Sequence, residues 1–387
     1  MSNTIRKKIL FHYMIGGTAG GSDTCLFLLL KYLDQSKYDI YLLYKDRSKF
    51  VDELESLGIK IIQVYNNEIT ITKNHGKSSN VKNIKEVGSL RTFLGGIKKI
   101  VKERKKIKNI MKIIDDYKID IIHGNHYLTG DRVALIAGLL KRKVVISHNR
   151  GLYPPDIIDK YIANKIDEMI CMSDFSKSVY TQNGISDKKC KTIYDGIEID
   201  EKDIIVKSEG ETKIGCFGRL ENWKGQKTLV NAVEIIKKTN TNIKVYLVGN
   251  GPSEEELKQL VKEKGLEDLV VFTGHITNVK DYMQSCSIVV HTSIVPEPFG
   301  MVITEAMALG KPVIATNFGG PLEIIDNEKD GFLIPPQKPI ILAETILKLL
   351  KDLNLRNQIG KKAKEKVISK FDVKDYAKKI EQEYENI

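Results

Sequence analysis

Short apolar runs alternate with longer amphipathic or polar stretches along most of the chain. The runs in the first half cover residues 7–13, 39–44, 59–64, 119–123, 143–148, 168–172 and 190–194. A second series covers residues 213–218, 243–249, 269–273, 287–292, 312–316 and 331–335. Short runs rich in β-branched residues are typical of buried strands. Because helical or polar stretches separate them, the pattern predicts parallel, doubly wound sheets with helices on both faces.

The length of the chain indicates two domains rather than one core. The chain has 387 residues, of which 42% are hydrophobic and 29% are charged, as in an ordinary globular protein. A polar stretch at residues 202–212 precedes the second series of strands. We therefore expect a first α/β domain over residues 1–196 and a second over residues 197–365, each binding ligands at the carboxyl ends of its strands.

Two glutamates follow the strand predicted at residues 287–292. Glu297 lies in a loop, a helix begins near Gly300, and Glu305 lies about one turn inside that helix. The N-terminus of a helix presents unpaired N–H groups and the positive end of the helix dipole, and Gly300 has no side chain to obstruct a ligand. The segment therefore predicts a phosphate site beside two carboxylates that can accept hydrogen bonds from sugar hydroxyls.

Residues 15–21 form a glycine-rich turn, Ile-Gly-Gly-Thr-Ala-Gly-Gly, between the first strand and the first helix. The turn lacks the Gly-x-Gly-x-x-Gly spacing of dinucleotide-binding loops and the Lys-Ser/Thr end of a P-loop. One interpretation is a tight turn. The other is close approach of the backbone to a ligand, which we favour because its four glycines exceed what a turn requires.

The formal net charge of +11 favours an anionic partner, which can be nucleic acid, an anionic membrane or a phosphorylated substrate. The sequence contains no helix-turn-helix, zinc-finger or aromatic RNA-binding motif, so we expect no nucleic-acid partner. A predicted helix at residues 97–114 combines one acid, Glu103, with Lys98, Lys99, Lys102, Arg104, Lys105, Lys106, Lys108 and Lys112. This basic face is either simply solvated or docks on anionic phospholipid headgroups.

Cysteine usage and hydropathy indicate a protein of a reducing compartment. The five cysteines are scattered at positions 25, 171, 190, 216 and 286, which predicts neither disulfides nor a zinc site. No apolar stretch approaches the roughly twenty residues that span a bilayer, and the first residues do not resemble a secretory signal. We expect a cytoplasmic location, either free or peripheral at the inner face of the membrane.

The segment from Glu297 to Thr316 resembles the signature of retaining GT-B glycosyltransferases of family 4. It has two glutamates separated by seven residues, with Phe-Gly after the first and Ala-Met-Ala-Leu-Gly-Lys-Pro-Val-Ile after the second. Further segments match the family in the same order, at residues 191–198, 218–225, 248–252 and 272–276. In the first of these, the inter-domain connector, Asp195 replaces the usual asparagine, and we expect the turn to survive because both residues tolerate turn conformations.

The resemblance covers nearly the whole chain and implies the GT-B architecture, in which two Rossmann-like domains face each other across a cleft. It also implies that the last helix, predicted from Val373 to Tyr384, returns to the first domain, so we assign the C-terminal segment from residue 366 to 387 to that domain. In the family, the glycine-rich turn at residues 15–21 faces the donor phosphates and the acceptor.

Roles for individual residues follow from the same resemblance. Arg219 and Lys224 would hold the donor diphosphate, Glu297 the sugar hydroxyls, and His148 the sugar from the other domain; these four are the candidate catalytic residues. The expected donor-binding residues are Gly17, Gly249, Asn250, Gly251, Thr273, Gly274, His275, Phe299, Gly300, Met301, Val302 and Glu305, the last on the ribose. The candidates on the acceptor side are Gly16, His123 and His126. We interpret His12, His75 and His291 as ordinary packed or hydrogen-bonded side chains.

The implied function is transfer of a hexose-type sugar from a UDP- or GDP-sugar, with retention, in cell-surface polysaccharide or glycolipid synthesis. The acceptor would be a hydroxyl of a glycan, a lipid-linked molecule or another compound. Alternatives are a sugar-nucleotide epimerase or sugar phosphorylase on the same architecture, or a non-catalytic sugar-nucleotide-binding partner. No convincing Asp-x-Asp motif is present, since Asp115 and Asp116 lie in the basic helix and Glu198 precedes Asp200. We therefore expect activity without a metal or another cofactor.

Overall fold

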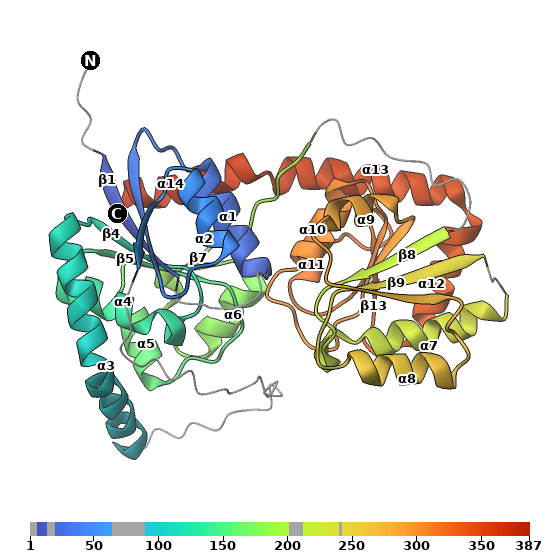
Figure 1. Cartoon of the computed structure of the whole chain (residues 1–387), viewed down its shortest axis with the longest axis horizontal. Helices are drawn as coiled ribbons and strands as arrows, with labels where there is room; N and C mark the ends of the chain where they lie inside the picture. Colours follow the sequence, from blue (N-terminus) through green and yellow to red (C-terminus); the bar gives the residue numbers. More distant parts are fainter. Residues whose placement is uncertain (1–5, 14–19, 64–89, 201–211, 240–241) are drawn as a thin grey trace. The chain divides into compact units, whose positions relative to one another are not determined.

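The computed structural model describes residues 6–13, 20–63, 90–200, 212–239 and 242–387, without the side chains of residues 90–99. The chain divides into two compact units: unit 1 comprises Met1–Gly196 and Val373–Ile387, and unit 2 comprises Ile197–Asp372. Each unit contains one sheet with helices on both of its faces (Figure 1). The strands predicted from the sequence are present, with ends that differ by at most two residues.

The sheet of unit 1 is entirely parallel and has the strand order β3-β2-β1-β4-β5-β6-β7. Its strands are β1 (Lys7–Tyr13), β2 (Tyr38–Tyr44), β3 (Lys60–Gln63), β4 (Ile121–Gly124), β5 (Val144–Asn149), β6 (Glu168–Cys171) and β7 (Cys190–Thr192). Its helices are α1 (Gly21–Tyr32), α2 (Lys49–Ser56), α3 (Leu90–Tyr117), α4 (Leu128–Leu140), α5 (Ile157–Ala163), α6 (Asp174–Gln182), the short 3-10 helix η1 (Asp187–Lys189) and α14 (Val373–Asn386).

Alternate residues of each strand in unit 1 enter two different cores. Ile9 and Phe11 of β1 pack with α1, α2 and α14, whereas Leu10 packs with α3, α4 and α5 on the opposite face. The two groups of helices lie on opposite sides of the sheet (Figure 1). This period of two explains why the strands are apolar throughout rather than alternating, since both faces of a doubly wound sheet are buried.

Unit 2 repeats this architecture with the strand order β10-β9-β8-β11-β12-β13, again all parallel. Its strands are β8 (Thr212–Phe217), β9 (Ile243–Val248), β10 (Val270–Gly274), β11 (Ile288–His291), β12 (Val313–Thr316) and β13 (Phe332–Ile334). Its helices are the 3-10 helix η2 (Asn222–Lys224), α7 (Gln226–Lys237), α8 (Glu254–Glu263), α9 (Val279–Ser285), α10 (Met301–Ala308), α11 (Pro321–Ile324), α12 (Pro339–Lys351) and α13 (Leu353–Lys370).

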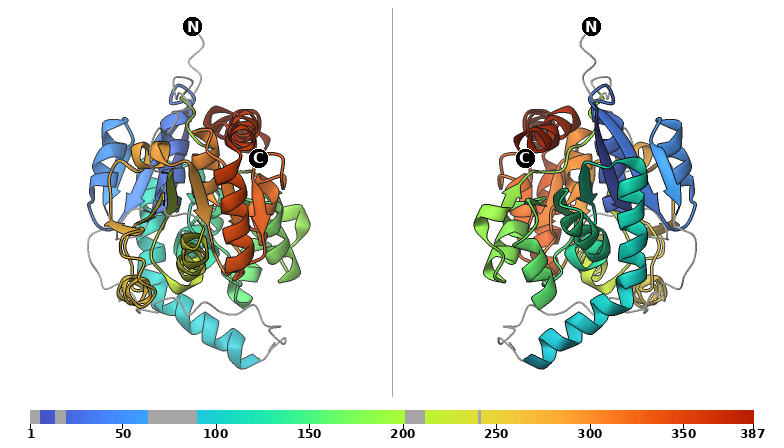
Figure 2. Two further views of the ribbon diagram at one scale, coloured as in Figure 1. Left: turned by 90° about the vertical axis from the view of Figure 1, so that its right-hand side faces the viewer. Right: turned by 90° about the vertical axis from the view of Figure 1, so that its left-hand side faces the viewer.

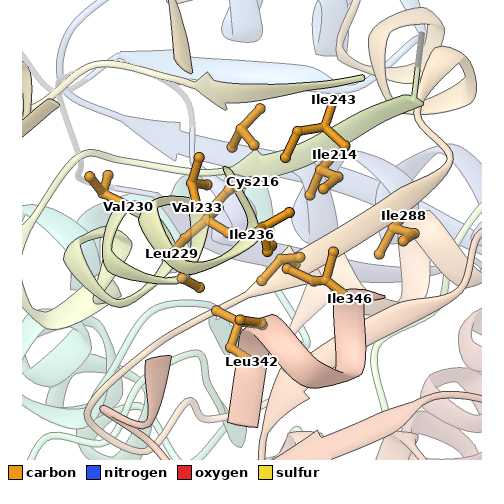
Figure 3. Packing of buried hydrophobic residues seen from close by; sticks show 14 of the residues in the cluster. Ile214, Cys216, Leu229, Val230, Val233, Ile236, Ile243, Ile288, Leu342 and Ile346 are labelled. Carbon is orange, nitrogen blue, oxygen red and sulfur yellow. The ribbon is translucent and has the colours of Figure 1, made fainter. Parts of the chain in front are cut away.

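The larger core of unit 2 lies between its sheet and helices α7, α8 and α12. Leu229 and Val233 of α7 point toward the sheet, where they meet Ile214 of β8, and Leu342 and Ile346 of α12 lie beside them (Figure 3). On the other face, α10 packs against β11, β12 and α13. The well-filled core makes the sheet a rigid base for the loops at the carboxyl ends of its strands.

The C-terminal segment returns to unit 1 at a later residue than the sequence predicted. Helix α13 continues to Lys370 within unit 2, so the returning segment begins at Val373 rather than at residue 366. Helix α14 then buries Ile380 and Tyr384 completely in the core of unit 1. At the other crossing of the chain, Gly196 has no room for a side chain, because a Cβ there would lie 2.5 Å from Cα of Val373.

Helix α3 is longer than the predicted helix at residues 97–114 and spans 28 residues. Its N-terminal half extends beyond the other helices of unit 1 (Figure 2). From residue 100 onward, Ile107, Ile110 and Ile114 are buried against the sheet, whereas the opposite face is exposed. Among the described residues, no helix is both long enough and apolar enough to cross a membrane.

Candidate active site

In unit 2 the residues predicted to carry the chemistry meet at the carboxyl ends of β8 and β11. These neighbouring strands lie where the strand order reverses, which is the usual place for ligands in doubly wound sheets. Two hydrogen bonds join the loops that follow them: Ile294 N donates to Trp223 O at 2.8 Å, and Thr292 Oγ1 donates to Lys224 O at 2.9 Å. Gly225 permits this contact, because its φ is +69° and a Cβ there would lie 2.1 Å from Thr292 O.

Glu297 is the centre of this site. Its carboxylate is buried, and three donors converge on Oε1: Lys224 Nζ at 2.5 Å, Ser293 Oγ at 2.6 Å and His291 Nε2 at 3.2 Å. All three of these hydrogen bonds from the described part of the chain go to Oε1 and none to Oε2. Glu297 therefore has one oxygen fixed by the protein and a second oxygen that can accept a hydrogen bond from a ligand.

The Glu297 carboxylate stays ionised despite its burial. Burial alone would raise its pKa, but the charge of Lys224 and the hydrogen bond from His291 outweigh it and hold the pKa of Glu297 well below its ordinary value. Since the carboxylate accepts from His291 Nε2, that nitrogen carries the proton. Sequence reasoning treated His291 as an ordinary hydrogen-bonded side chain and overlooked Ser293, because nothing in the local sequence indicates that Glu297 folds back onto its own strand.

The loop after β12 supports the backbone of Glu297. Gly320 N donates to Glu297 O at 2.9 Å, and a Cβ at Gly319 would lie 2.6 Å from the same oxygen. A Cβ at Gly320 would lie 2.3 Å from Phe299 O. The glycine pair is thus required for the close contact, and the sequence analysis missed it because its partner lies about twenty residues earlier in the chain.

Helix α10 begins directly after this loop, as predicted. Gly300 precedes it with φ of +132°, a conformation that a residue with a side chain rarely adopts. The first N–H groups of a helix, here those of Met301 and Val302, have no intrahelical acceptor. They therefore lie at the carboxyl end of β11 as potential donors to an anion, next to the Glu297 loop.

Glu305 has a very different environment from Glu297. It lies one turn inside α10, is partly exposed, and makes no side-chain hydrogen bond or ion pair in the part of the structure described. Burial by the surrounding protein raises the pKa of Glu305 from 4.5 to about 7. The environments of the two acids of the predicted motif therefore shift their pKa values in opposite directions.

Arg219 and Lys224, the predicted diphosphate cations, lie in the loop after β8 but differ in exposure. Lys224 is only 19% exposed, and its ammonium lies 4.3 Å from the centre of the Trp223 ring. Arg219 is 70% exposed, and its Nη2 lies 2.5 Å from Glu221 Oε1. Lys224 is therefore a fixed part of the site, whereas Arg219 lies at its surface.

The loops after β9 and β10 pack beside the loop after β8. Gly249 N donates to Gly274 O at 3.0 Å, and Leu220 N donates to Asn250 O at 2.9 Å. Cβ atoms at Gly249 and Gly251 would lie 2.1 Å from Gly218 O and 2.3 Å from Leu220 O. The structure thus brings these segments together, with Thr273 beside Gly274 and His275 exposed at the next position. Their contact with a donor remains a prediction.

His148, the predicted catalytic residue of unit 1, belongs to a fully buried polar cluster. Its neighbour Arg150 forms an ion pair with Asp195, and Arg150 Nη2 also donates to Tyr376 Oη at 2.9 Å and to Asn125 Oδ1 at 3.1 Å. Burial and the charge of Arg150 lower the pKa of His148 well below its ordinary value, so the imidazole is neutral. Its Nε2 has no hydrogen-bond partner in the described structure.

This cluster gives the substitution at the connector a physical reason. Asp195, which the resemblance sets against an asparagine, has a charge that compensates the buried guanidinium of Arg150. Cys25 Sγ donates to its second oxygen at 3.2 Å. Sequence reasoning did not find Arg150, because its carboxylate partner follows it by 45 residues and no local pattern links them.

The acceptor-side candidates have structural partners of their own. Tyr384 Oη is hydrogen-bonded to His123 Nδ1 at 2.8 Å, and burial lowers the pKa of His123 to about 3. His126 donates its backbone N–H to Asp131 at 2.8 Å, and Asp131 also contacts His12 Nδ1 at 2.7 Å. Burial lowers the pKa of His126 to about 4. The remaining candidates, Gly16 and Gly17, and also His75, lie outside the described residues.

Two parallel sheets in this strand order define a two-domain Rossmann-like protein, with a buried carboxylate and lysine at the switch point of the second sheet. Comparison with known proteins identifies the family. The model of "Glycosyl transferases group 1" matches residues 198–366, and that of "Glycosyltransferase Family 4" matches residues 19–201. The chain belongs to the GT-B glycosyltransferases of group 1, so the predicted fold class is confirmed.

Individual relatives agree with this assignment. An uncharacterised glycosyltransferase of Methanocaldococcus jannaschii is 31% identical over 284 residues, which cover 67% of this chain and 77% of the relative. The lipopolysaccharide core biosynthesis glycosyltransferase LpsD of Rhizobium meliloti is 34% identical over 158 residues, or 41% of this chain and 45% of LpsD. The crystal structure of Anabaena HepE in complex with UDP-glucose matches with a TM-score of 0.79 and 25% identity, covering 98% of this chain and all of HepE.

The raised pKa of Glu305 makes stability depend on pH in a defined direction. The folded protein holds this proton more tightly than the unfolded chain, so stability falls as pH rises from about 4.5 to about 7. Glu305→Gln cannot ionise and should melt at a higher temperature than the wild type near pH 8, but at the same temperature near pH 5. Glu344→Gln, at an exposed position, is the control and should change the melting temperature neither near pH 8 nor near pH 5. Equal melting of wild type and Glu305→Gln near pH 8 would contradict the assigned environment.

Proposed function

We propose that this glycosyltransferase moves a hexose-type sugar from a nucleoside diphosphate sugar to a hydroxyl acceptor with retention of configuration. The observation that carries the proposal is the buried, ionised Glu297 carboxylate, paired with Lys224 and next to the N-terminus of α10. One carboxylate oxygen is thus available to accept hydrogen bonds from a sugar, while the lysine and the helix N–H groups can donate hydrogen bonds to a diphosphate. The complex of HepE with UDP-glucose supports a donor of this class.

The chemistry assigns a role to each group. As the bond to the sugar breaks, negative charge accumulates on the departing diphosphate, and preplaced cations and N–H groups stabilise that charge. Lys224, Arg219 and the N–H groups of Met301 and Val302 would serve here. Glu297 Oε2 would accept from sugar hydroxyls, and its negative charge would favour the cationic character that develops on the ring.

Glu305 and His148 have supporting roles in this proposal. Glu305 would accept from the ribose hydroxyls, and neutral His148 would contact the sugar. No enzymatic nucleophile is assigned, so retention follows from a same-face displacement in which the leaving phosphate takes the proton of the acceptor hydroxyl. The name of LpsD supports an acceptor in cell-surface polysaccharide or glycolipid synthesis.

Incubation with a panel of UDP- and GDP-sugars tests the proposal. Nucleoside diphosphate released only when an acceptor is present supports transfer. A sugar that is altered without an acceptor would indicate an epimerase. Cleavage that depends on phosphate would indicate a phosphorylase. Binding without turnover would indicate a non-catalytic partner. The anomeric configuration of the product, measured by NMR, distinguishes retention from inversion.

Glu297→Ala should lower turnover by about 100-fold or more, because the lost contacts strengthen as charge develops on the sugar. Nucleotide affinity should change much less than turnover, because Lys224 keeps its charge and its contact with the Trp223 ring although it loses its carboxylate partner. Steady-state kinetics and calorimetric titration with nucleoside diphosphate measure the two effects separately. Glu297→Gln controls for packing because it preserves the shape of the side chain. Near-normal turnover in Glu297→Ala would contradict the assignment.

Activity should survive EDTA, because protein cations can neutralise the diphosphate. Charge-assisted hydrogen bonds contribute about 1.5 to 3 kcal/mol each, so Lys224→Ala should lower the rate by about 10- to 100-fold or more. The loss of rate in Arg219→Ala should lie toward the lower end of this range, because the Arg219 side chain is 70% exposed. Complete loss of wild-type activity in EDTA, with recovery in magnesium or manganese, would show that a metal holds the diphosphate.

We also propose peripheral contact with anionic membranes through the exposed cations of α3, Lys102, Arg104, Lys105, Lys108 and Lys112. Each could add about 1 kcal/mol near an anionic surface. Changing Lys102, Lys105, Lys108 and Lys112 to Glu should reduce sedimentation with phosphatidylserine vesicles at low salt. The control changes exposed lysines of other helices, Lys361, Lys362, Lys378 and Lys379, to Glu. Wild-type protein that never sediments with these vesicles would favour a solvated face.

A further inference from the structure

We propose that Trp223 and Glu221 are positioning residues that place the two cations of the β8 loop, Lys224 and Arg219, for the donor diphosphate. This inference rests on the proposed function, because it concerns the same cations. Neither residue is assigned a contact with the substrate. Their action is exerted through the side chains that they hold.

Hydrogen bonds between the loops fix the backbone of Lys224, but they do not by themselves fix the position of its ammonium. Hydrogen bonds from Thr292 Oγ1 and Ile294 N hold the carbonyl groups of Lys224 and Trp223. Four rotatable bonds then separate the Lys224 backbone from its ammonium, so the loop alone does not determine where the charge lies. Contacts of the side chain must do so.

The Trp223 ring and the Glu297 carboxylate hold the ammonium between them. Nζ of Lys224 lies 4.3 Å from the ring centre and 2.5 Å from Glu297 Oε1. Tryptophan gives the strongest attraction to a cation among the aromatic side chains, and the attraction is larger where water is excluded. An ammonium has three N–H donors and Glu297 takes one, so the charge is fixed while donors remain for a phosphate.

Glu221 holds the ring and the second cation together. Its Oε2 accepts from Trp223 Nε1, and its Oε1 lies 2.5 Å from Arg219 Nη2. Glu221 is only 19% exposed, whereas Arg219 is 70% exposed. The largely buried Glu221 carboxylate therefore fixes the plane of the Trp223 ring and restrains the exposed guanidinium of Arg219. The result is one continuous series of contacts from Arg219 through Glu221 and Trp223 to Lys224 and Glu297.

Trp223 is the single tryptophan of the chain, so its fluorescence reports on this site alone. Titration with UDP and with GDP should change its emission, because a bound diphosphate draws the Lys224 ammonium partly away from the ring. Lys224→Ala should remove most of that change. In Glu221→Ala the fluorescence anisotropy of the free protein should fall, whereas Glu221→Gln should preserve it because an amide oxygen still accepts from the indole N–H.

A double-mutant cycle tests the positioning role. Trp223→Leu should lower kcat/KM for the donor by about 3- to 30-fold, the range of a cation–π contact. Trp223→Phe should recover part of the loss, because it keeps an aromatic ring but loses the N–H that Glu221 accepts. In the Lys224→Ala background, Trp223→Leu should have less than about a twofold further effect, because the two residues act as one unit. Unchanged melting temperatures control for folding.

The outcomes separate the two proposals. If Lys224→Ala itself leaves donor kinetics unchanged, the proposed role of Lys224 in holding the diphosphate is wrong. If Lys224→Ala is impaired but the Trp223→Leu effect is absent, or adds fully to it, only the positioning role is overturned. A Trp223→Phe variant as impaired as Trp223→Leu, with native melting, would also overturn the role of the ring.

Discussion

The ion pair between Glu297 and Lys224 is the interaction on which the candidate site depends. An isolated carboxylate is costly to bury, and this one is stable only because the Lys224 ammonium and two further donors, from His291 and Ser293, meet the same oxygen. The pair in turn requires that the loops after β8 and β11 touch, and Gly225 allows that contact. Removal of either charged partner would leave the other buried without compensation, which is why the loops, the glycine and the two side chains form one unit.

Unit 1 uses the same physical solution with different residues. Arg150 and Asp195 form a buried ion pair near the carboxyl end of β5, and Tyr376 of α14 and Asn125 after β4 satisfy further N–H groups of the guanidinium. Burial and the charge of Arg150 together hold the pKa of His148 well below its ordinary value, so the histidine is neutral. Because α14 supplies one of the partners, the returning C-terminal helix does more than cover the core: it completes the polar cluster that surrounds the predicted sugar-contacting histidine.

The sequence predicted the strands and the two-domain architecture well, because apolar runs, glycines and helix starts are local signals. Local signals also predicted the loop and helix that carry Glu297 and Glu305, whereas Lys224 and the glycine turn at 249–251 were assigned from the family resemblance, and their roles stay predictions. Partners from distant segments were not predictable: Gly319 and Gly320 support Glu297, and Arg150 compensates Asp195, but neither pairing has a recognisable spacing. The start of the returning segment was placed at residue 366 for a related reason, since α13 runs on to Lys370 within unit 2 and packs against α10.

The two glutamates of the motif show that spacing sets position while environment sets chemistry. Both are acids of one loop and helix, yet the pKa of Glu297 is held well below its ordinary value and that of Glu305 is raised to about 7. Environments that separate the pKa values of neighbouring acids commonly mark a division of roles. Glu297 has its charge compensated by the protein before any ligand arrives, so it can act on a developing positive charge without reorganisation. Glu305 has no such partner in the described structure, and hydroxyl donors from a ligand would stabilise its ionised form. Binding of the ribose hydroxyls at Glu305, as proposed, would therefore be linked to loss of a proton near neutral pH, whereas the charge of Glu297 is independent of pH in that range.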